Sequence, residues 1–501
     1  MVGWAHIWFR RVLTQGLWYN PHMILDALPY TELPENQNST KKSIQAFVRF
    51  IEKKLGISAV YDGRTIPFGQ TTLIEQIQLA QKLLDLGVID QYYPRETLCD
   101  EPALRIWGCT STKASNLHTG GASFSSEAAA LTAALAESLE RYIWYTQSDY
   151  FIAPTRATVA EIATRGAHIA PEQFTSFSKQ QRESTPNFFL HADASYLWIQ
   201  AHSLTLKKKI YVPAQTVSPT VPGYTYPAEP LIRQQTTIGL ATWPTQKGAQ
   251  LAGALEIIER EALMIMWYNQ LTLPQIDLES LRFKREDLDR ILESCKRYNL
   301  SVHAIPMMTD APTHAVCVIL EDKSGVAPRF AIGLKAHRSL PYAIERALTE
   351  ALRARLGYRT FFLHDGVWNP DTPVDEVGHI ERLHYWGVPT NAERLTFLIA
   401  GEKLPYTFDA PWEQDSEEEH LDRVLSWCRE KNFECASVSL TASKVNSTPW
   451  HIEMVVMPDL HPTHLHEKRR HLGGNRLTDV PKFFGFTPRT APFTDNPHPY
   501  A

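Results

Sequence analysis

The sequence has few features that would cross-link the chain or place it in a membrane. Its six cysteines lie far apart and form no CxxC pair, so we expect reduced thiols and neither a disulfide nor a zinc framework. The longest apolar runs are too short to cross a bilayer. The N-terminal apolar stretch breaks at Arg10 and Arg11 without a small-residue cleavage site, which argues against a signal peptide. The sequence therefore predicts a cytoplasmic protein with no membrane span.

Strong charge and several common catalytic motifs are also missing. A formal net charge of −5 gives no reason to expect nucleic-acid binding. No P-loop of the type GxxxxGK(S/T) and no GxSxG serine motif occurs, which argues against a P-loop nucleotide site and a serine-hydrolase elbow. The histidine-dense segment 459–471 includes His464 and His466, which could ligate zinc in a hydrolase. Because no second cluster at suitable spacing accompanies them, a surface loop is the simpler interpretation.

What the sequence does contain is typical of a large globular protein. Of its 501 residues, 44% are hydrophobic, enough for sizeable cores. Short β-type runs lie between helical stretches without strict alternation, which favours an α/β or α+β fold. Helices are predicted at 44–55, 71–87, 125–145, 246–268 and 341–356, and strands at 196–204, 209–217, 302–308 and 315–322.

The two ends of the chain differ from the middle. Residues 1–60 are rich in aromatic side chains and are interpreted as an extension that packs on the main domain, 61–501, or on a partner. The last 26 residues contain five prolines, which predicts an extended segment along a surface. A disordered tail is the alternative.

One arrangement of charged residues occurs twice. Glu137, Glu140 and Arg141 in "ALAESLERYIW" lie within one helical turn, as do Glu256, Glu259 and Arg260 in "GALEIIEREAL". Such residues can form surface pairs, each contributing about 0.3 to 0.5 kcal/mol. If the helices converge instead, Mg²⁺ must offset the repulsion among the carboxylates, and the arginines could bind phosphate oxygens. A glycine pair in "HTGGASFSSEAAA" is a weak further candidate for anion binding.

A third helix, "LPYAIERALTEALRARLGYR", completes a resemblance to a known family. Together with "GGASFSSEAAALTAALAESLERY" and "TTIGLATWPTQKGAQLAGALEIIERE", its segment "AIERALTEALRAR" resembles the three ATP-binding blocks of the YcaO superfamily, in the same order. "TIPFGQTTLIEQIQLAQKLLDLG" is similar to the opening helix of that domain. The ending "HLGGNRLTDVP…NPHPYA" is similar to the proline-rich terminus of azoline-forming members, where the tail lies near the active site.

The resemblance implies a YcaO-type ATP-binding fold with mixed sheets packed by helices, and a peptide cyclodehydratase that uses ATP and Mg²⁺. In such enzymes a Cys, Ser or Thr side chain attacks the preceding amide, and phosphorylation of the hemiorthoamide oxygen allows a thiazoline or oxazoline to form. The implied metal ligands are Glu140, Glu256, Glu259 and Glu350. The implied nucleotide-binding residues are Glu137, Arg141, Gln250, Arg260 and Arg353, and the implied catalytic tail residues are Pro497, Pro499 and Ala501.

Several positions depart from the family pattern. Gly248 stands where many members have an acid, Ala133 where a serine is common, and Arg353 where glutamine is usual. The chain also ends in Tyr500 and Ala501 where a final proline is common. Because a lost carboxylate would weaken a magnesium site, a non-catalytic scaffold subunit is one alternative. Thioamide or macroamidine formation at the same ATP site is another.

The resemblance also implies binding partners. We expect a precursor peptide as substrate and a partner protein of the E1-like or ocin-ThiF type that binds its leader. An FMN-dependent azoline dehydrogenase is a further expected partner, and a homodimer is an open alternative. Neither nucleic acid nor membrane is expected as a partner.

Overall fold

A computed structural model describes residues 72–114, 117–146, 154–184, 193–218, 229–365, 368–408, 410–441 and 447–500. They belong to one compact unit, Thr65–Ala501. The helix predicted at 44–55, the extension 1–60 and Ala501 lie outside the described residues. The domain boundary at residues 60 and 61 therefore stays a prediction. No helix in the described ranges is both long enough and apolar enough to cross a membrane.

The described strands form three antiparallel sheets and one short parallel pair, with the orders β1-β2-β3, β11-β10-β9, β4-β5-β13-β14-β7 with β6 on β5, and β12-β8. Separate antiparallel sheets packed by helices define an α+β architecture, which confirms the predicted fold class. The strands are β1 Gln91–Arg95, β2 Arg105–Ser111, β3 Leu117–Ser123, β4 Thr155–Thr158, β5 Ser195–Ser203, β6 Lys208–Pro213, β7 Leu240–Trp243, β8 Gln275–Ile276, β9 Leu300–Pro306, β10 His314–Asp322, β11 Phe330–His337, β12 Lys403–Leu404, β13 Ala436–Ser439 and β14 His451–Val456.

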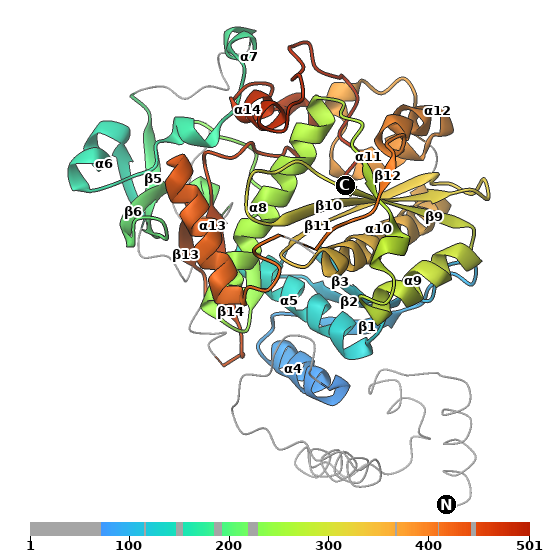
Figure 1. Cartoon of the computed structure of the whole chain (residues 1–501). Helices are drawn as coiled ribbons and strands as arrows, with labels where there is room; N and C mark the ends of the chain where they lie inside the picture. The colour runs from blue at the N-terminus through green and yellow to red at the C-terminus, as the bar shows by residue number, and fades with distance from the viewer. Residues whose placement is uncertain are drawn as a thin grey trace, which may run out of the picture. The chain divides into compact units, whose positions relative to one another are not determined.

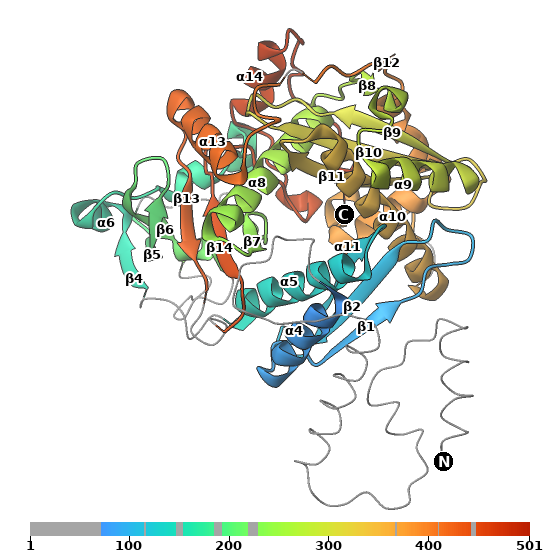
Figure 2. The ribbon, with the colours of Figure 1, turned by 60° about the horizontal axis from the view of Figure 1, so that its bottom comes forward.

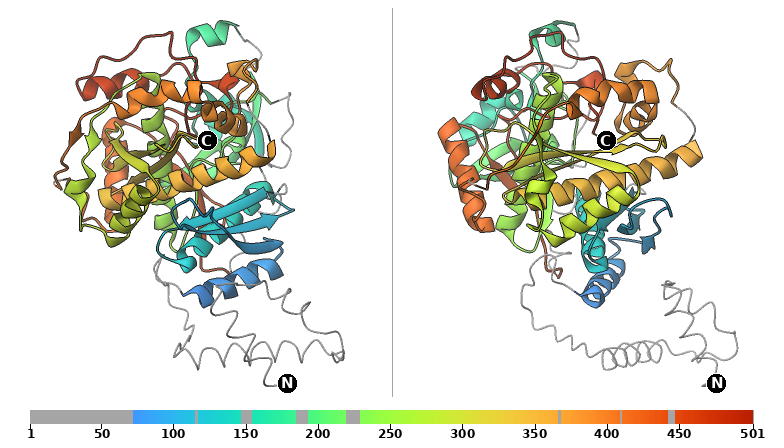
Figure 3. Two further views of the ribbon diagram at one scale, coloured as in Figure 1. Left: turned by 90° about the vertical axis from the view of Figure 1, so that its right-hand side faces the viewer. Right: turned by 45° about the vertical axis from the view of Figure 1, so that its right-hand side comes forward.

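Three long helices connect these sheets. Helix α5 packs on β2, β3 and β7, and α8 packs on β7 and β14 on one side and β10 and β11 on the other (Figure 1). Helix α10 covers β10 and β11 and also touches β3 (Figure 3). The helices are α4 Leu73–Asp85, α5 Glu127–Thr146, α6 Val159–Arg165, α7 Lys179–Ser184, α8 Gln246–Tyr268, α9 Glu286–Arg297, α10 Leu340–Asp365, α11 His379–Gly387, α12 Pro389–Ala392, α13 Glu417–Lys431 and α14 Arg476–Phe483.

Most predicted elements are present with small boundary changes. The helix predicted at 71–87 is α4, which begins with a capping box of Thr72 and Glu75 and lies against α5 (Figure 2). Helix α8 has the predicted bounds, whereas α10 continues past the predicted end to Asp365. The strand predicted at 209–217 is wrong in its second half, because β6 ends at Pro213 and a 3₁₀ turn follows.

Glycines let the long helices approach the strands closely. A Cβ on Gly121 of β3 would lie 2.1 Å from the carbonyl oxygen of Ala130 in α5, and one on Gly333 of β11 would lie 2.0 Å from that of Ala347 in α10. On α8, a Cβ on Gly253 would lie 2.4 Å from the carbonyl oxygen of Gly239. At each of these positions a Cβ would overlap with a backbone oxygen, so only glycine allows the helix to approach the neighbouring backbone this closely.

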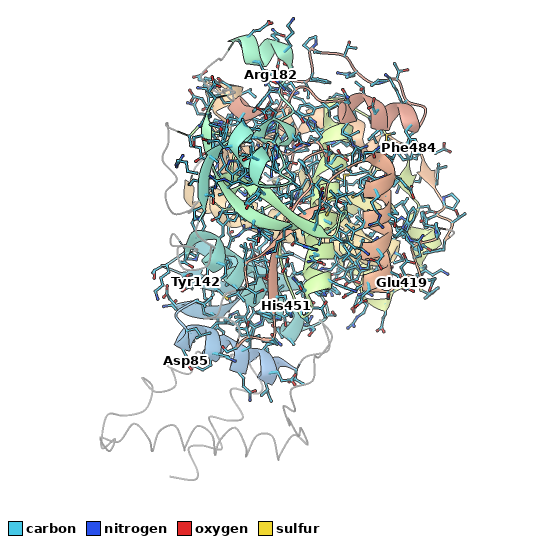
Figure 4. The ribbon with its side chains drawn as sticks, turned by 90° about the vertical axis from the view of Figure 1, so that its left-hand side faces the viewer. Asp85, Tyr142, Arg182, Glu419, His451 and Phe484 are labelled. Atoms are coloured by element: carbon cyan, nitrogen blue, oxygen red, sulfur yellow. The ribbon has the colours of Figure 1, made fainter. Side chains whose placement is uncertain are left out.

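The proline-rich end is not extended along its whole length. It contains α14, whose exposed end carries Phe484 on the opposite side of the unit from Tyr142 of α5 (Figure 4). Pro497 and His498 are buried. The prediction that the tail runs along a surface is therefore wrong at its tip, because polar partners inside the protein hold that tip.

Candidate active site

Five glutamates from α5, α8 and α10 share one hydrogen-bonding arrangement. One carboxylate oxygen of each accepts a backbone N–H from β3, β7, β11 or the residue just before β7, so the helix–strand contact fixes the position of the carboxylate. The pairs are Glu137 with Gly120 at 3.2 Å, Glu140 with Thr242 at 2.7 Å, Glu256 with Gly239 at 3.0 Å, Glu259 with Ala336 at 2.6 Å and Glu350 with Leu334 at 2.7 Å.

The carboxylates of different helices lie close enough to perturb one another. The pKa of Glu140 is raised to about 8, chiefly by burial and further by the charges of Glu137 and Glu256, against the opposing effect of Arg141. Burial also raises the pKa of Glu259, with Glu350 and Glu256 acting in the same direction. Glutamates of α5, α8 and α10 therefore meet in one cluster, which is incompatible with separate surface ion pairs.

Three arginines lie among these carboxylates. Arg260 contacts Glu259 at 2.7 Å and Glu256 at 3.4 Å. Glu137 is 3.6 Å from Arg141 and 3.8 Å from Arg353, and Arg353 also donates to the Gly120 carbonyl oxygen at 2.5 Å. Arg141, Arg260 and Arg353 therefore occupy the cluster that the sequence pattern predicted for them.

The cluster has the donor set that Mg²⁺ requires. The three guanidinium groups pair with Glu137, Glu256 and Glu259, whereas Glu140 and Glu350 form no ion pair with any described residue. Carboxylate oxygens are ligands that Mg²⁺ prefers, and the cation would offset both the burial of Glu140 and the repulsion from Glu137 and Glu256, which raise its pKa. Glu140, Glu256, Glu259 and Glu350 could hold the metal, while the arginines remain available for phosphate oxygens.

The comparisons with known proteins agree with this geometry. Residues 121–461 match the family model described as YcaO cyclodehydratase, ATP- and Mg²⁺-binding. The chain belongs to the YcaO family. The matched range includes all three long helices of the cluster. No curated protein matches the sequence.

Solved structures share the YcaO fold at low sequence identity. A heterocyclase in complex with substrate and cofactor is 21% identical, with a TM-score of 0.69 over 90% of this chain and 60% of that chain. YcaO from Methanopyrus kandleri, bound with AMPPCP and Mg²⁺, is 15% identical, with a TM-score of 0.57 over 80% of this chain and 93% of that one. The E. coli microcin synthetase McbBCD complex with pro-MccB17 bound is 14% identical, with a TM-score of 0.55 over 82% and 96%. This chain thus spans 60% of the length of the heterocyclase.

The departure from the YcaO pattern at Gly248 of α8 has a local structural reason. A Cβ on Gly248 would lie 1.9 Å from Cδ1 of Trp243, so the indole occupies the space that an acidic side chain would need. Gln250 does not join the carboxylate cluster. It donates to Glu453 of β14 at 3.5 Å, as Gln246 does at 3.0 Å. The predicted nucleotide contact of Gln250 is therefore not supported by its position.

The tail reaches the cluster through Tyr500, which the sequence analysis did not assign to the site. The Tyr500 hydroxyl donates to Glu350 at 2.7 Å, and the Arg260 guanidinium lies 4.2 Å from the centroid of the Tyr500 ring. Pro497 is buried and Pro499 is partly buried beside it. The predicted catalytic roles of Pro497 and Pro499 remain predictions, and Tyr500 provides the observed contact. Its position where a final proline is common was the available signal.

A buried polar network holds the tip of the tail in place. Nε2 of His498 lies 2.9 Å from the carbonyl oxygen of His464, and Arg382 donates to the carbonyl oxygen of Tyr500 at 3.2 Å and to Glu467 at 2.9 Å. His464, His498 and Glu467 are all buried. The interpretation of this segment as a surface loop is therefore wrong.

The zinc-hydrolase alternative receives little support from this network. The possible ligand atoms of His464, Glu467 and His498 lie within 4.8 Å of one another. However, Glu467 is already paired with Arg382, whose charge would oppose a cation. His466 accepts from the N–H of Lys468 in its own 3₁₀ turn, so the two histidines singled out from the sequence do not act as a pair.

Proposed function

We propose that the chain catalyses the ATP- and Mg²⁺-dependent cyclodehydration of Cys, Ser or Thr residues in a ribosomal precursor peptide. The product would be a thiazoline or an oxazoline. The observation that carries the proposal is the convergence of five amide-anchored glutamates and three arginines in a chain of the YcaO cyclodehydratase family.

The chemistry explains why this site suits the reaction. An amide oxygen is a poor leaving group, and its phosphorylation at the hemiorthoamide stage allows it to depart as phosphate. Phosphoryl transfer depends mainly on positioning and on neutralising charge. When bound, Mg²⁺ supplies part of that neutralisation, and Glu140, Glu256, Glu259 and Glu350 are the residues that would hold it.

Arg260 is the best-positioned arginine for a phosphate oxygen. Glu256 and Glu259 fix its guanidinium from one side, and the ring of Tyr500 lies over it. A side chain held by three neighbours loses little further freedom when it binds an anion. Tyr500 thereby links the tail to phosphate binding, since the same residue also donates to Glu350.

The expected partners extend this proposal. Solved neighbours are a heterocyclase with its substrate and a synthetase complex with bound pro-MccB17, which supports a peptide substrate and an assembly with other subunits. We infer a leader-binding protein of the E1-like or ocin-ThiF type as one partner, as the resemblance to azoline-forming YcaO members implies. An FMN-dependent azoline dehydrogenase would act after this step.

Mass spectrometry of the precursor peptide tests the proposal. The full chain, with and without its candidate partner, is incubated with peptide, ATP and Mg²⁺, and we expect the loss of one water for each modified residue. A mass gain from the replacement of oxygen by sulfur would identify thioamide formation instead. An unmodified peptide together with no ATP consumption in the complete mixture would contradict an enzymatic role and favour the scaffold alternative.

A further inference from the structure

A polar pocket lies beside the carboxylate cluster and shares Arg260 with it. Its polar walls come from three parts of the chain: the segment before β7, helix α8 and the segment after β14. The polar lining residues are Arg233, Thr236, Arg260, His461 and Thr463. The remaining walls are apolar, among them Ile257 and Met457. Among the described residues that line this pocket, two are arginines and none is a carboxylate.

Arg233 differs from the arginines of the cluster because it has no acidic partner. It forms no ion pair with any described residue, and its recorded neighbour is the ring of Phe174, 5.5 Å from the guanidinium carbon to the ring centroid. Burial alone lowers the pKa of Arg233 to about 10. A partly buried guanidinium without a counter-ion is costly, and a bound anion is one way to offset that cost.

The other polar groups of the pocket can also act as donors. The hydroxyls of Thr236 and Thr463 can each donate to an oxyanion. His461 is 2% exposed, and at least one of its ring nitrogens lacks a hydrogen-bond partner. Burial lowers the pKa of His461 to about 3, so the ring is neutral and carries one N–H donor. Two guanidinium groups and several neutral donors are suited to an anion with several oxygens.

We propose that this pocket is an oxyanion subsite in which Arg233 and Arg260 together bind a tetrahedral phosphate. The proposal rests on the proposed function, because Arg260 would contact the phosphate oxygens of the nucleotide. Phosphate released by the reaction would then lie at one wall of the pocket, where Arg260 is shared with Arg233. An acidic side chain of the precursor peptide has the same oxyanion chemistry and is the second source. The apolar walls lower the local dielectric and so strengthen either contact.

Equilibrium binding of inorganic phosphate to the full chain tests the subsite without requiring catalysis. Titration calorimetry compares the wild type with Arg233→Gln, with Arg233→Lys and with Arg423→Gln, a control whose arginine lies on α13 and pairs with Asp415. We expect Arg233→Gln to weaken phosphate binding about tenfold or more, since a hydrogen bond from a charged group contributes on that scale. Arg233→Lys should retain part of the affinity, and Arg423→Gln should bind like the wild type.

A second measurement separates the two sources of the anion. With a precursor peptide that contains acidic residues and one in which they are replaced by their amides, the KM for peptide is compared between the wild type and Arg233→Gln. A rise in KM for the acidic peptide alone, without a change in phosphate affinity, would identify the peptide carboxylate as the ligand. Thr236→Val is a second variant for the phosphate titration if Arg233→Gln does not fold, and it should weaken phosphate binding several-fold.

The subsite proposal would be overturned if Arg233→Gln bound both phosphate and the acidic peptide with the affinity of the wild type. Failure of the proposed function has a different signature: no water loss from the peptide in any mixture, with phosphate binding still dependent on Arg233. The two proposals can therefore fail independently.

Discussion

Replacing Glu140 with glutamine should stabilise the magnesium-free protein at pH 8. Glutamine keeps an oxygen that can accept the Thr242 N–H, as Glu140 does at 2.7 Å, and it removes a negative charge beside Glu137 and Glu256. An ordinary ion pair on a helix surface would give the opposite result, because loss of the carboxylate would slightly destabilise the fold. The sign of the effect therefore distinguishes the two interpretations of the repeated Glu–Glu–Arg pattern.

The magnitude follows from the pKa. Burial first, and the charges of Glu137 and Glu256 next, raise the pKa of Glu140 from 4.5 to about 8 against the effect of Arg141. The folded protein therefore binds more protons than the unfolded chain between those values, and stability falls as pH rises through that window. At about 1.4 kcal/mol for each pKa unit, the penalty reaches on the order of 4 to 5 kcal/mol at pH 8. Because Glu140 is only partly buried, we expect water to reduce it to about 2 to 4 kcal/mol.

Urea unfolding in the presence of a chelator, followed by tryptophan fluorescence from pH 5 to pH 8, measures this penalty. The wild type should lose stability relative to Glu140→Gln as pH rises, and the two should be similar near pH 5. Added Mg²⁺ should stabilise the wild type more than the variant, because the metal replaces the bound proton. Glu279→Gln, at an exposed glutamate paired with Arg282, should follow the wild type. A wild-type advantage over Glu140→Gln that does not change with pH would refute the reasoning.

Three further changes test other parts of the site. Glu256→Gln should abolish ATP consumption with little loss of stability, and ATP consumption within about twofold of the wild type would contradict a role in metal binding. Tyr500→Phe should lower azoline formation more than nucleotide binding, because the phenyl group can still cover Arg260 while the hydroxyl that contacts Glu350 is lost. Equal azoline formation by the variant and the wild type would argue against the tail contact. Gly333→Ala should destabilise the protein by several kcal/mol, since the added Cβ would meet a carbonyl oxygen at 2.0 Å. The comparison change Gly357→Ala lies in α10, the helix that Gly333 of β11 faces, and has open space around it. It should be neutral or stabilising by about 1 kcal/mol, and equal melting temperatures for these two glycine variants would contradict the packing argument.

The helices and most of their charged residues were predictable because they depend on local spacing. Apolar periodicity predicted the bounds of α8, and the i, i+3 and i+4 positions placed Glu256, Glu259 and Arg260 on one face. The strand amides that hold the carboxylates could not be predicted in this way. Gly239 lies 17 residues before Glu256, and Ala336 lies 77 residues after Glu259. Those contacts depend on how each helix crosses its strand, which is a tertiary property.

Composition was a poor guide to the tail. The five prolines indicated an extended surface segment, and the tip is indeed not part of any described strand. The residues that hold the tip inside the protein are not prolines. His498 and the backbone carbonyl of Tyr500 find partners in His464 and Arg382 inside the protein, and these partners come from segments that no local pattern connects to the last residues.

Helix α10 shows that acidic and basic residues at helical spacing do not always form a site. On α10, Glu345 pairs with Arg285, and Arg355 pairs with Glu101 at 2.9 Å, both away from the cluster. Glu350 differs because its helix crosses β11 at Gly333 and brings the carboxylate to the N–H of Leu334.

The glycine pair of β3 also shows how a close contact between helix and strand positions a carboxylate. Gly121 lets α5 approach the strand, and the amide of Gly120 binds a carboxylate of the protein itself, Glu137. The predicted anion cradle is therefore occupied by a side chain of the site. The glycines thus create the site indirectly, by fixing the distance at which helix carboxylates meet strand amides. A substitution that leaves every glutamate intact but separates helix from strand should therefore abolish metal binding as completely as the loss of a glutamate.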